Sequence, residues 1–201
     1  MEDQPKPPPD KAKRRFLTIA TGMVGGIAAV AVAAPFVSSL MPSERAKAAG
    51  APVEVDIGKI EPGMMISVEW RGRPVWIVNR TPEMLATLPK LDEQLVDPHS
   101  MQPLQPDYCQ NIHRSIKPQY LVVIGICTHL GCSPTAKLES GDESAMGATW
   151  PGGFLCPCHG STFDLAGRVF EGVPAPVNLE VPRYAYLSDT RLLIGEDAKG
   201  A

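Results

Sequence analysis

The feature that most constrains this chain is a pair of six-residue stretches, each of which contains two cysteines and one histidine. They are Cys127-Thr-His-Leu-Gly-Cys132 and Cys156-Pro-Cys-His-Gly-Ser161. Cys-x-His followed by Cys-x-x-His supplies two thiolates and two imidazoles. This is the donor set of a two-iron, two-sulfide cluster with cysteines on one iron and histidines on the other. The predicted ligands are Cys127, His129, Cys156 and His159.

A structural zinc site is the alternative interpretation, because zinc also takes cysteine and histidine ligands. Zinc needs only four ligands, so the six cysteines and histidines of the two stretches would leave two unexplained. The 23 residues between Cys132 and Cys156 also differ from common zinc-finger spacings.

Residues 16–40 run for 25 positions without a charged side chain. At 1.5 Å per residue, a helix of this length measures about 37 Å, enough to cross a hydrocarbon layer of ~30 Å. We therefore predict a transmembrane anchor over 16–40, preceded by a disordered, proline-rich segment over 1–15. A cleaved signal peptide is the alternative, since Ala46 and Ala48 offer a cleavage site.

More basic residues precede the anchor than follow it, so the positive-inside rule predicts a cytoplasmic N-terminus with the rest of the chain across the membrane. Lys13-Arg14-Arg15-Phe16-Leu17 resembles a twin-arginine export signal, with a spacing one residue from the usual pattern; flanking positive charge alone is the alternative. Residues 41–52 are rich in alanine, glycine and charge. They are predicted to form a flexible hinge that reaches about 36 Å when extended.

From residue 53 onward the chain is predicted to be antiparallel β structure, in keeping with its 21 prolines and 18 glycines. Ile66, Val68 and Trp70 alternate with polar residues, as in a half-buried strand. Residues 89–118 show little periodicity and predict a long loop; Cys109 lies there and receives no metal role. The net charge of −3 gives no reason to expect a nucleic-acid partner.

Histidine ligation would give the predicted centre two properties. Neutral imidazoles in place of two thiolates leave less negative charge on the site, so it accepts an electron more readily. A metal-bound imidazole keeps one N–H, so His129 and His159 can pass a proton together with an electron, as oxidation of a quinol requires. Ser161 is placed to donate its hydroxyl to a cluster sulfur; an ordinary serine at the start of a strand is the alternative.

Several motifs together resemble the Rieske iron–sulfur subunit of bacterial cytochrome bc1 complexes, the ubiquinol–cytochrome c reductases. They are the two stretches above, Arg114-Ser-Ile-Lys-Pro118, Gly172-Val-Pro-Ala-Pro176 and Asn178-Leu-Glu-Val-Pro182. The resemblance covers nearly the whole chain and implies a mainly β protein. Its expected parts are the N-terminal transmembrane helix, the hinge, and an antiparallel, β-sandwich-like head over 53–201 with a small cluster-binding subdomain at about 125–176.

By this resemblance the head holds one 2Fe-2S cluster on the four predicted ligands, with Ser161 beside it and a disulfide between Cys132 and Cys158. A stable disulfide requires an oxidising compartment. The expected location is therefore a bacterial inner membrane, with the head in the periplasm.

The resemblance also implies partners and a reaction. His159, together with His129, would face ubiquinol at a site on cytochrome b, with Leu130 at the tip. The head would then move to deliver its electron to cytochrome c1, within a complex expected to be dimeric. Residues 172–176, the proline loop, would cover the other side of the cluster.

Two positions depart from the family. Phe163 stands where many members have a tyrosine that donates to a ligand sulfur, so we expect a lower midpoint potential. Val173 stands in the proline loop where glycine is frequent. The alternative functions are a Rieske subunit of a cytochrome b6f-type complex or arsenite oxidase, which the loop and the hinge disfavour, and a soluble Rieske ferredoxin, which the anchor and the spare cysteines disfavour.

Overall fold

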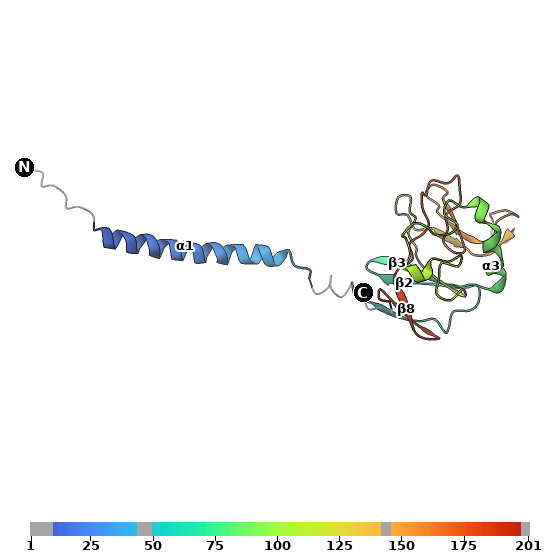
Figure 1. Cartoon of the computed structure of the whole chain (residues 1–201), viewed down its shortest axis with the longest axis horizontal. Coiled ribbons are helices and arrows are strands. Elements are labelled where there is room, and N and C mark those ends of the chain that lie inside the picture. Colours follow the sequence, from blue (N-terminus) through green and yellow to red (C-terminus); the bar gives the residue numbers. More distant parts are fainter. Residues whose placement is uncertain (1–9, 44–49, 142–145, 198–201) are drawn as a thin grey trace, which may run out of the picture. The chain divides into compact units, whose positions relative to one another are not determined.

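The computed structural model describes residues 10–43, 50–141 and 146–197, which form two units, an N-terminal helix and a head (Figure 1). The two units are described separately. Residues 1–9 of the predicted disordered segment and residues 44–49 of the predicted hinge lie outside the described residues.

The helix α1 covers Lys11–Ser39 and is long and apolar enough to cross a membrane. It begins five residues before the predicted anchor, so the prediction of disorder is wrong for residues 11–15. The cause is local: the Asp10 carboxylate accepts the N–H groups of Ala12 and Lys13, which caps the first turn. Lysine, alanine and arginine follow, and all three favour helix.

The head consists of three antiparallel sheets of three strands each, which confirms the predicted fold class. One sheet has the order β1-β9-β8, the second β2-β3-β4 and the third β5-β6-β7. The strands are β1 Val53–Asp56, β2 Met65–Trp70, β3 Arg73–Asn79, β4 Tyr120–Ile124, β5 Thr135–Lys137, β6 Gly153–Leu155, β7 Thr162–Asp164, β8 Tyr184–Ser188 and β9 Arg191–Ile194.

The sheet β2-β3-β4 forms the centre of the core. In β2 the predicted alternation is confirmed, because Ser67 and Glu69 are exposed and their neighbours are covered. β3 lies between β2 and β4, and its last five residues are buried, as expected of a central strand. Trp76 of β3 stacks on Phe154 of β6 with ring centroids 5.1 Å apart, which fixes the sheet β5-β6-β7 against the central sheet.

The short helix α3 covers Pro82–Thr87. Thr81 is its N-cap and accepts the N–H of Met84 at 3.3 Å, and Pro82 occupies the first turn, where its missing N–H costs nothing.

The segment 88–118 is a loop, as predicted, but it is well packed. Three 3-10 turns shape it: η1 (Leu88–Lys90), η2 (Asp92–Gln94) and η3 (Asp107–Cys109). Leu91, Leu95 and Cys109 are buried in it. Two isolated bridges, Phe163 to Val169 and Leu95 to Phe170, connect the segment after β7 to the head.

Three fully buried arginines hold this loop and the turn after β7 together. Arg80 donates to the carbonyl of Leu165 at 2.9 Å, Arg114 to those of Ala166 and Gly167, and Arg168 to that of Leu88 at 2.7 Å. Burial lowers the pKa of Arg80 to about 10, although the charge of Asp164 acts to raise it. Burial also lowers the pKa of Arg114 to about 10. Both guanidiniums therefore stay charged at neutral pH.

Asp164 is the fully buried carboxylate at the centre of this network. It accepts the backbone N–H of Ala166 at 2.9 Å, the N–H of Arg168 at 2.8 Å and the Nε–H of the same arginine at 2.8 Å. Neither side chain touches solvent, so loss of the Asp164 charge would leave the buried Arg168 guanidinium with one charged partner, the partly exposed Asp92 carboxylate at 3.1 Å.

We predict that Asp164→Asn lowers the free energy of unfolding by about 3 kcal/mol or more, the usual cost of breaking a buried ion pair. Urea denaturation followed by circular dichroism measures it. Asp189→Asn is the matched control, since Asp189 pairs with Lys117 on the surface, and its stability should not change measurably. Equal stability of the two variants would contradict the structural role of Asp164.

Candidate metal centre

The first loop (Cys127–Cys132) and the second loop (Cys156–Ser161) share one backbone conformation. In each, the N–H of the first residue donates to the carbonyl of the sixth at 2.7 Å, and the N–H of the fifth donates to the carbonyl of the first at 3.0 Å. The fifth residues are Gly131 and Gly160, with φ of +84° and +78°, a conformation that favours glycine. The two motifs are therefore the same turn built twice.

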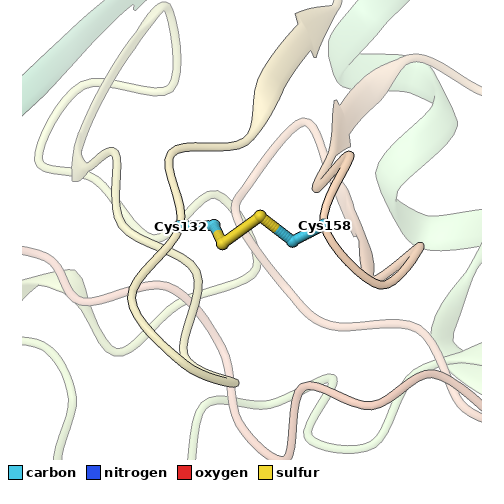
Figure 2. The surroundings of a disulfide bond; sticks show 2 residues. All are labelled: Cys132 and Cys158. Carbon is cyan, nitrogen blue, oxygen red and sulfur yellow. A yellow bond between two sulfur atoms is a disulfide. The ribbon is translucent and has the colours of Figure 1, made fainter.

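A disulfide between Cys132 and Cys158 joins the two loops, which confirms the predicted pairing (Figure 2). The other cysteines, Cys109, Cys127 and Cys156, are free. Cys127 and Cys156 are nearly completely buried at the base of the loops.

The predicted ligands meet as two pairs. Cys127 and Cys156 are hydrogen-bond neighbours, and the rings of His129 and His159 lie with centroids 4.8 Å apart and nearly perpendicular. The thiols are inside and the imidazoles outside, His129 half-buried and His159 exposed.

Burial is the main cause that raises the pKa of the Cys127 thiol, and the neighbouring Cys156 raises it further. The backbone N–H of His129 and the hydroxyl of Ser161 oppose this rise by hydrogen bonding to the sulfur. Without a bound metal, the Cys127 thiol keeps its proton. A bound cation would displace that proton and pair with the thiolate.

The donor set fits the cluster that the sequence predicts. Two buried thiols suit one iron and two imidazoles the other. The Nδ1 atom of His129 is buried and finds no hydrogen-bond partner among the described residues, which is costly for a polar atom unless it binds a metal. The Sγ atoms of Cys132, Cys156 and Cys158 also lie within 4.8 Å of one another, but those of Cys132 and Cys158 are bonded to each other and do not act as thiolate ligands.

Ser161 connects the site to the proline loop. It is fully buried, and its Oγ accepts the N–H of Ala175 at 3.0 Å while its hydroxyl hydrogen-bonds to Cys127. Thr128, which the sequence analysis did not single out, ties the first loop to the same segment by donating to the carbonyl of Val177 at 2.6 Å. The available signal was a polar residue between a predicted ligand cysteine and a predicted ligand histidine.

Other predicted positions have simpler surroundings. Leu130 is 72 % exposed at the tip of the first loop, and Val173 packs partly buried against the core. Phe163 is fully buried in the core that also contains Cys127. Cys109 lies 3.7 Å from the Tyr184 hydroxyl, and burial raises the pKa of its thiol to about 11, so it is a core residue.

Two families match this chain. Residues 97–185 match the Rieske [2Fe-2S] domain, and residues 5–43 match the TAT signal of the Fe-S subunit of ubiquinol–cytochrome c reductase. The second match covers the region in which the sequence resembles an export signal.

Several curated proteins are similar over nearly their whole length. The ubiquinol–cytochrome c reductase iron–sulfur subunit of Allochromatium vinosum is 60% identical over 96% of this chain and 92% of its own. That of Bradyrhizobium diazoefficiens is 42% identical, over 91% and 94%. Among solved structures, a chain of a hyperthermophilic respiratory Complex III is 25% identical and aligns over 88% of this chain and 99% of its own, with a TM-score of 0.47.

Gly125, two residues before the first loop, lies against the Trp76 indole, and a Cβ there would come within 2.1 Å of the ring. We predict that Gly125→Ala displaces Trp76 and lowers the free energy of unfolding of the head by about 1–3 kcal/mol or more. The variant should also bind less iron per chain. Urea denaturation and iron analysis measure both. Gly172→Ala is the control: its φ of +73° costs about 1 kcal/mol, but its Cβ meets no atom. An unchanged G125A protein would contradict this account.

Proposed function

Because this chain belongs to the Rieske iron–sulfur subunits of ubiquinol–cytochrome c reductase, an oxidoreductase, we propose that Cys127, His129, Cys156 and His159 hold its 2Fe-2S cluster and that the exposed imidazole of His159 meets ubiquinol. The observation that supports this most directly is the arrangement of the four donors as a buried thiol pair and an outer imidazole pair on two cross-linked loops.

When bound, such a cluster supplies a one-electron acceptor with a midpoint potential of roughly −150 to +300 mV. The chain's own residues determine the rest. Buried Nδ1 of His129 is the atom free to coordinate. His159 is exposed, so its outer ring nitrogen, once it has lost its own proton, can accept a hydrogen bond from a quinol hydroxyl and take the proton as the electron leaves the quinol.

The surface around His159 suits an apolar partner. Leu130, Pro157 and Pro174 are exposed close to the two loops in sequence, and none is charged. A docked partner can cover such a surface without burying a charge. We infer that this face docks on cytochrome b for quinol oxidation, and that the head then moves to cytochrome c1 on the hinge at 41–52.

We further propose that α1 remains as a single membrane anchor, with the N-terminus cytoplasmic and the head periplasmic in a bacterial inner membrane, in a dimeric complex. The length of α1, the match to a TAT signal over residues 5–43 and the disulfide support this topology. Export of the folded head through the twin-arginine route would allow the cluster to be inserted before the head crosses.

The test of the proposed centre is metal and labile-sulfide analysis of the full chain together with EPR of its reduced state. We expect iron and sulfide in equal amounts and a signal that appears only on reduction. Cys127→Ala and Cys156→Ala should lose both, whereas Cys109→Ala, the third free cysteine, should keep them. Zinc, or iron without sulfide, would contradict the proposal.

We predict that Ser161→Ala lowers the midpoint potential by tens of mV, because the hydroxyl stabilises the more negative reduced site through Cys127. A hydrogen bond worth about 1 kcal/mol more in the reduced state corresponds to about 40 mV for one electron. Redox titration followed by EPR measures this shift. Ser133→Ala, an exposed serine after Cys132, is the control, and an S161A potential equal to that of S133A would refute the assignment.

We predict that Phe163→Tyr raises the midpoint potential, since the new hydroxyl would donate to a ligand sulfur where the present ring has no donor. The same redox titration measures it. Phe163→Leu, which also lacks a donor, should show no rise. If F163Y does not exceed the parent potential, the account of this departure from the family is wrong.

A further inference from the structure

Three sulfur atoms lie together beside the proposed ligand set. The Sγ atoms of Cys132, Cys156 and Cys158 are within 4.8 Å of one another, the first and third share the disulfide that Figure 2 shows, and Cys156 is free. A free thiol next to a disulfide is the arrangement in which thiol–disulfide exchange takes place: a thiolate attacks one sulfur and the other departs.

We propose that the disulfide-bonded head, when it holds no cluster, undergoes an internal exchange that converts the Cys132–Cys158 bond into a Cys132–Cys156 bond. The thiolate of Cys156 attacks Sγ of Cys132, the bond to Cys158 breaks, and Cys158 leaves as a thiolate that takes a proton from water. The proton of Cys156 is lost to water before the attack. The protein contains one disulfide and three thiols before and after, so the step needs no oxidant or reductant.

The fold favours attack at Cys132 over attack at Cys158. A bond between Cys156 and Cys158 would close a ring over the single residue Pro157, whose φ is fixed. A bond to Cys132 instead joins two loops that adjoin already, since Thr135 of β5 pairs with Leu155 of β6. The departing Cys158 is exposed, so water stabilises its charge, whereas Cys132 is half-buried.

The consequence rests on the proposed function, because it concerns a proposed ligand. Exchange removes the Cys156 sulfur from the ligand set and leaves a new thiol at Cys158, on the surface. A cluster that engages the Cys156 sulfur prevents this. The cluster must therefore enter while the cysteines are reduced, and a head that is oxidised first, or that loses its cluster later, becomes unable to take one up until a thiol reductant opens the wrong bond.

The experiment uses the full chain in detergent, purified with its cluster. The cluster is removed with a chelator under anaerobic conditions without added thiol, and samples are alkylated over time and mapped by peptide mass spectrometry. We expect the Cys132–Cys158 peptide to decrease as the Cys132–Cys156 peptide increases, with alkylation moving from Cys156 to Cys158. The number of free thiols should stay at three. Cluster-loaded protein, alkylated alongside, should keep the original bond.

Two variants and one second measurement control the design. Cys156→Ser, which lacks a proposed ligand and is therefore incubated as metal-free protein from the start, should keep Cys132–Cys158. Cys109→Ala removes a thiol that is buried against Tyr184 and should exchange as the parent does. Reloading with iron and sulfide should fail in proportion to the exchanged fraction and recover after reduction with dithiothreitol. Urea-unfolded protein provides the pattern of random pairing, which includes Cys109.

The inference is overturned if the parent protein keeps Cys132–Cys158 with Cys156 alkylated, if the free thiols fall below three through oxidation, or if the folded protein gives the same mixture as the unfolded one. These outcomes leave the proposed function intact when iron, sulfide and the EPR signal are present. If zinc is found instead, the proposed function fails, while the exchange in metal-free protein still tests the placement of the three sulfurs.

Discussion

The cross-link between the two loops matters most because the sheet beneath them is too small to hold them by itself. β5, β6 and β7 have three residues each, and a sheet of this size buries little apolar surface. Its geometry therefore depends on contacts made elsewhere: the disulfide at the tips, the Trp76–Phe154 stack on one side, and the buried charges around Asp164 at the far end of β7. These three sets of contacts together hold the two loops, and the four predicted donors on them, in fixed positions.

Local signals in the sequence predicted the centre well. The spacing of the cysteines and histidines is determined within a few residues, and the structure reproduces the two loops and the disulfide. The ligand assignment itself stays a prediction. Long-range features were not accessible, because nothing near Asp164 or Arg168 in sequence reveals that the carbonyls of Leu88 and Pro98 will meet the arginine. Disorder at 11–15 was predicted from composition, and the Asp10 cap overrides it.

The order of burial at the centre connects the structure to the chemistry. Thiolates carry full charge and profit most from hydrogen-bond donors in a protected interior, which the N–H of His129 and the hydroxyl of Ser161 supply. An imidazole can exchange a proton with a substrate only if the substrate can reach it. In the proposed function, the inward sulfurs and the outward His159 would separate the storage of the electron from the contact with the proton donor.

The close packing of three sulfur atoms makes this centre rigid and also makes the proposed thiol–disulfide exchange possible. The disulfide fixes the loops only because Cys132 and Cys158 are close, and their closeness places both beside Cys156. Only Pro157 separates Cys156 from Cys158, so a movement of Cys156 away from Cys132 would also displace one end of the disulfide. In the proposed exchange, occupation of the Cys156 sulfur keeps the original bond in place. The match of residues 5–43 to a TAT signal is consistent with insertion of the cluster in the reducing cytoplasm, before the head is exported.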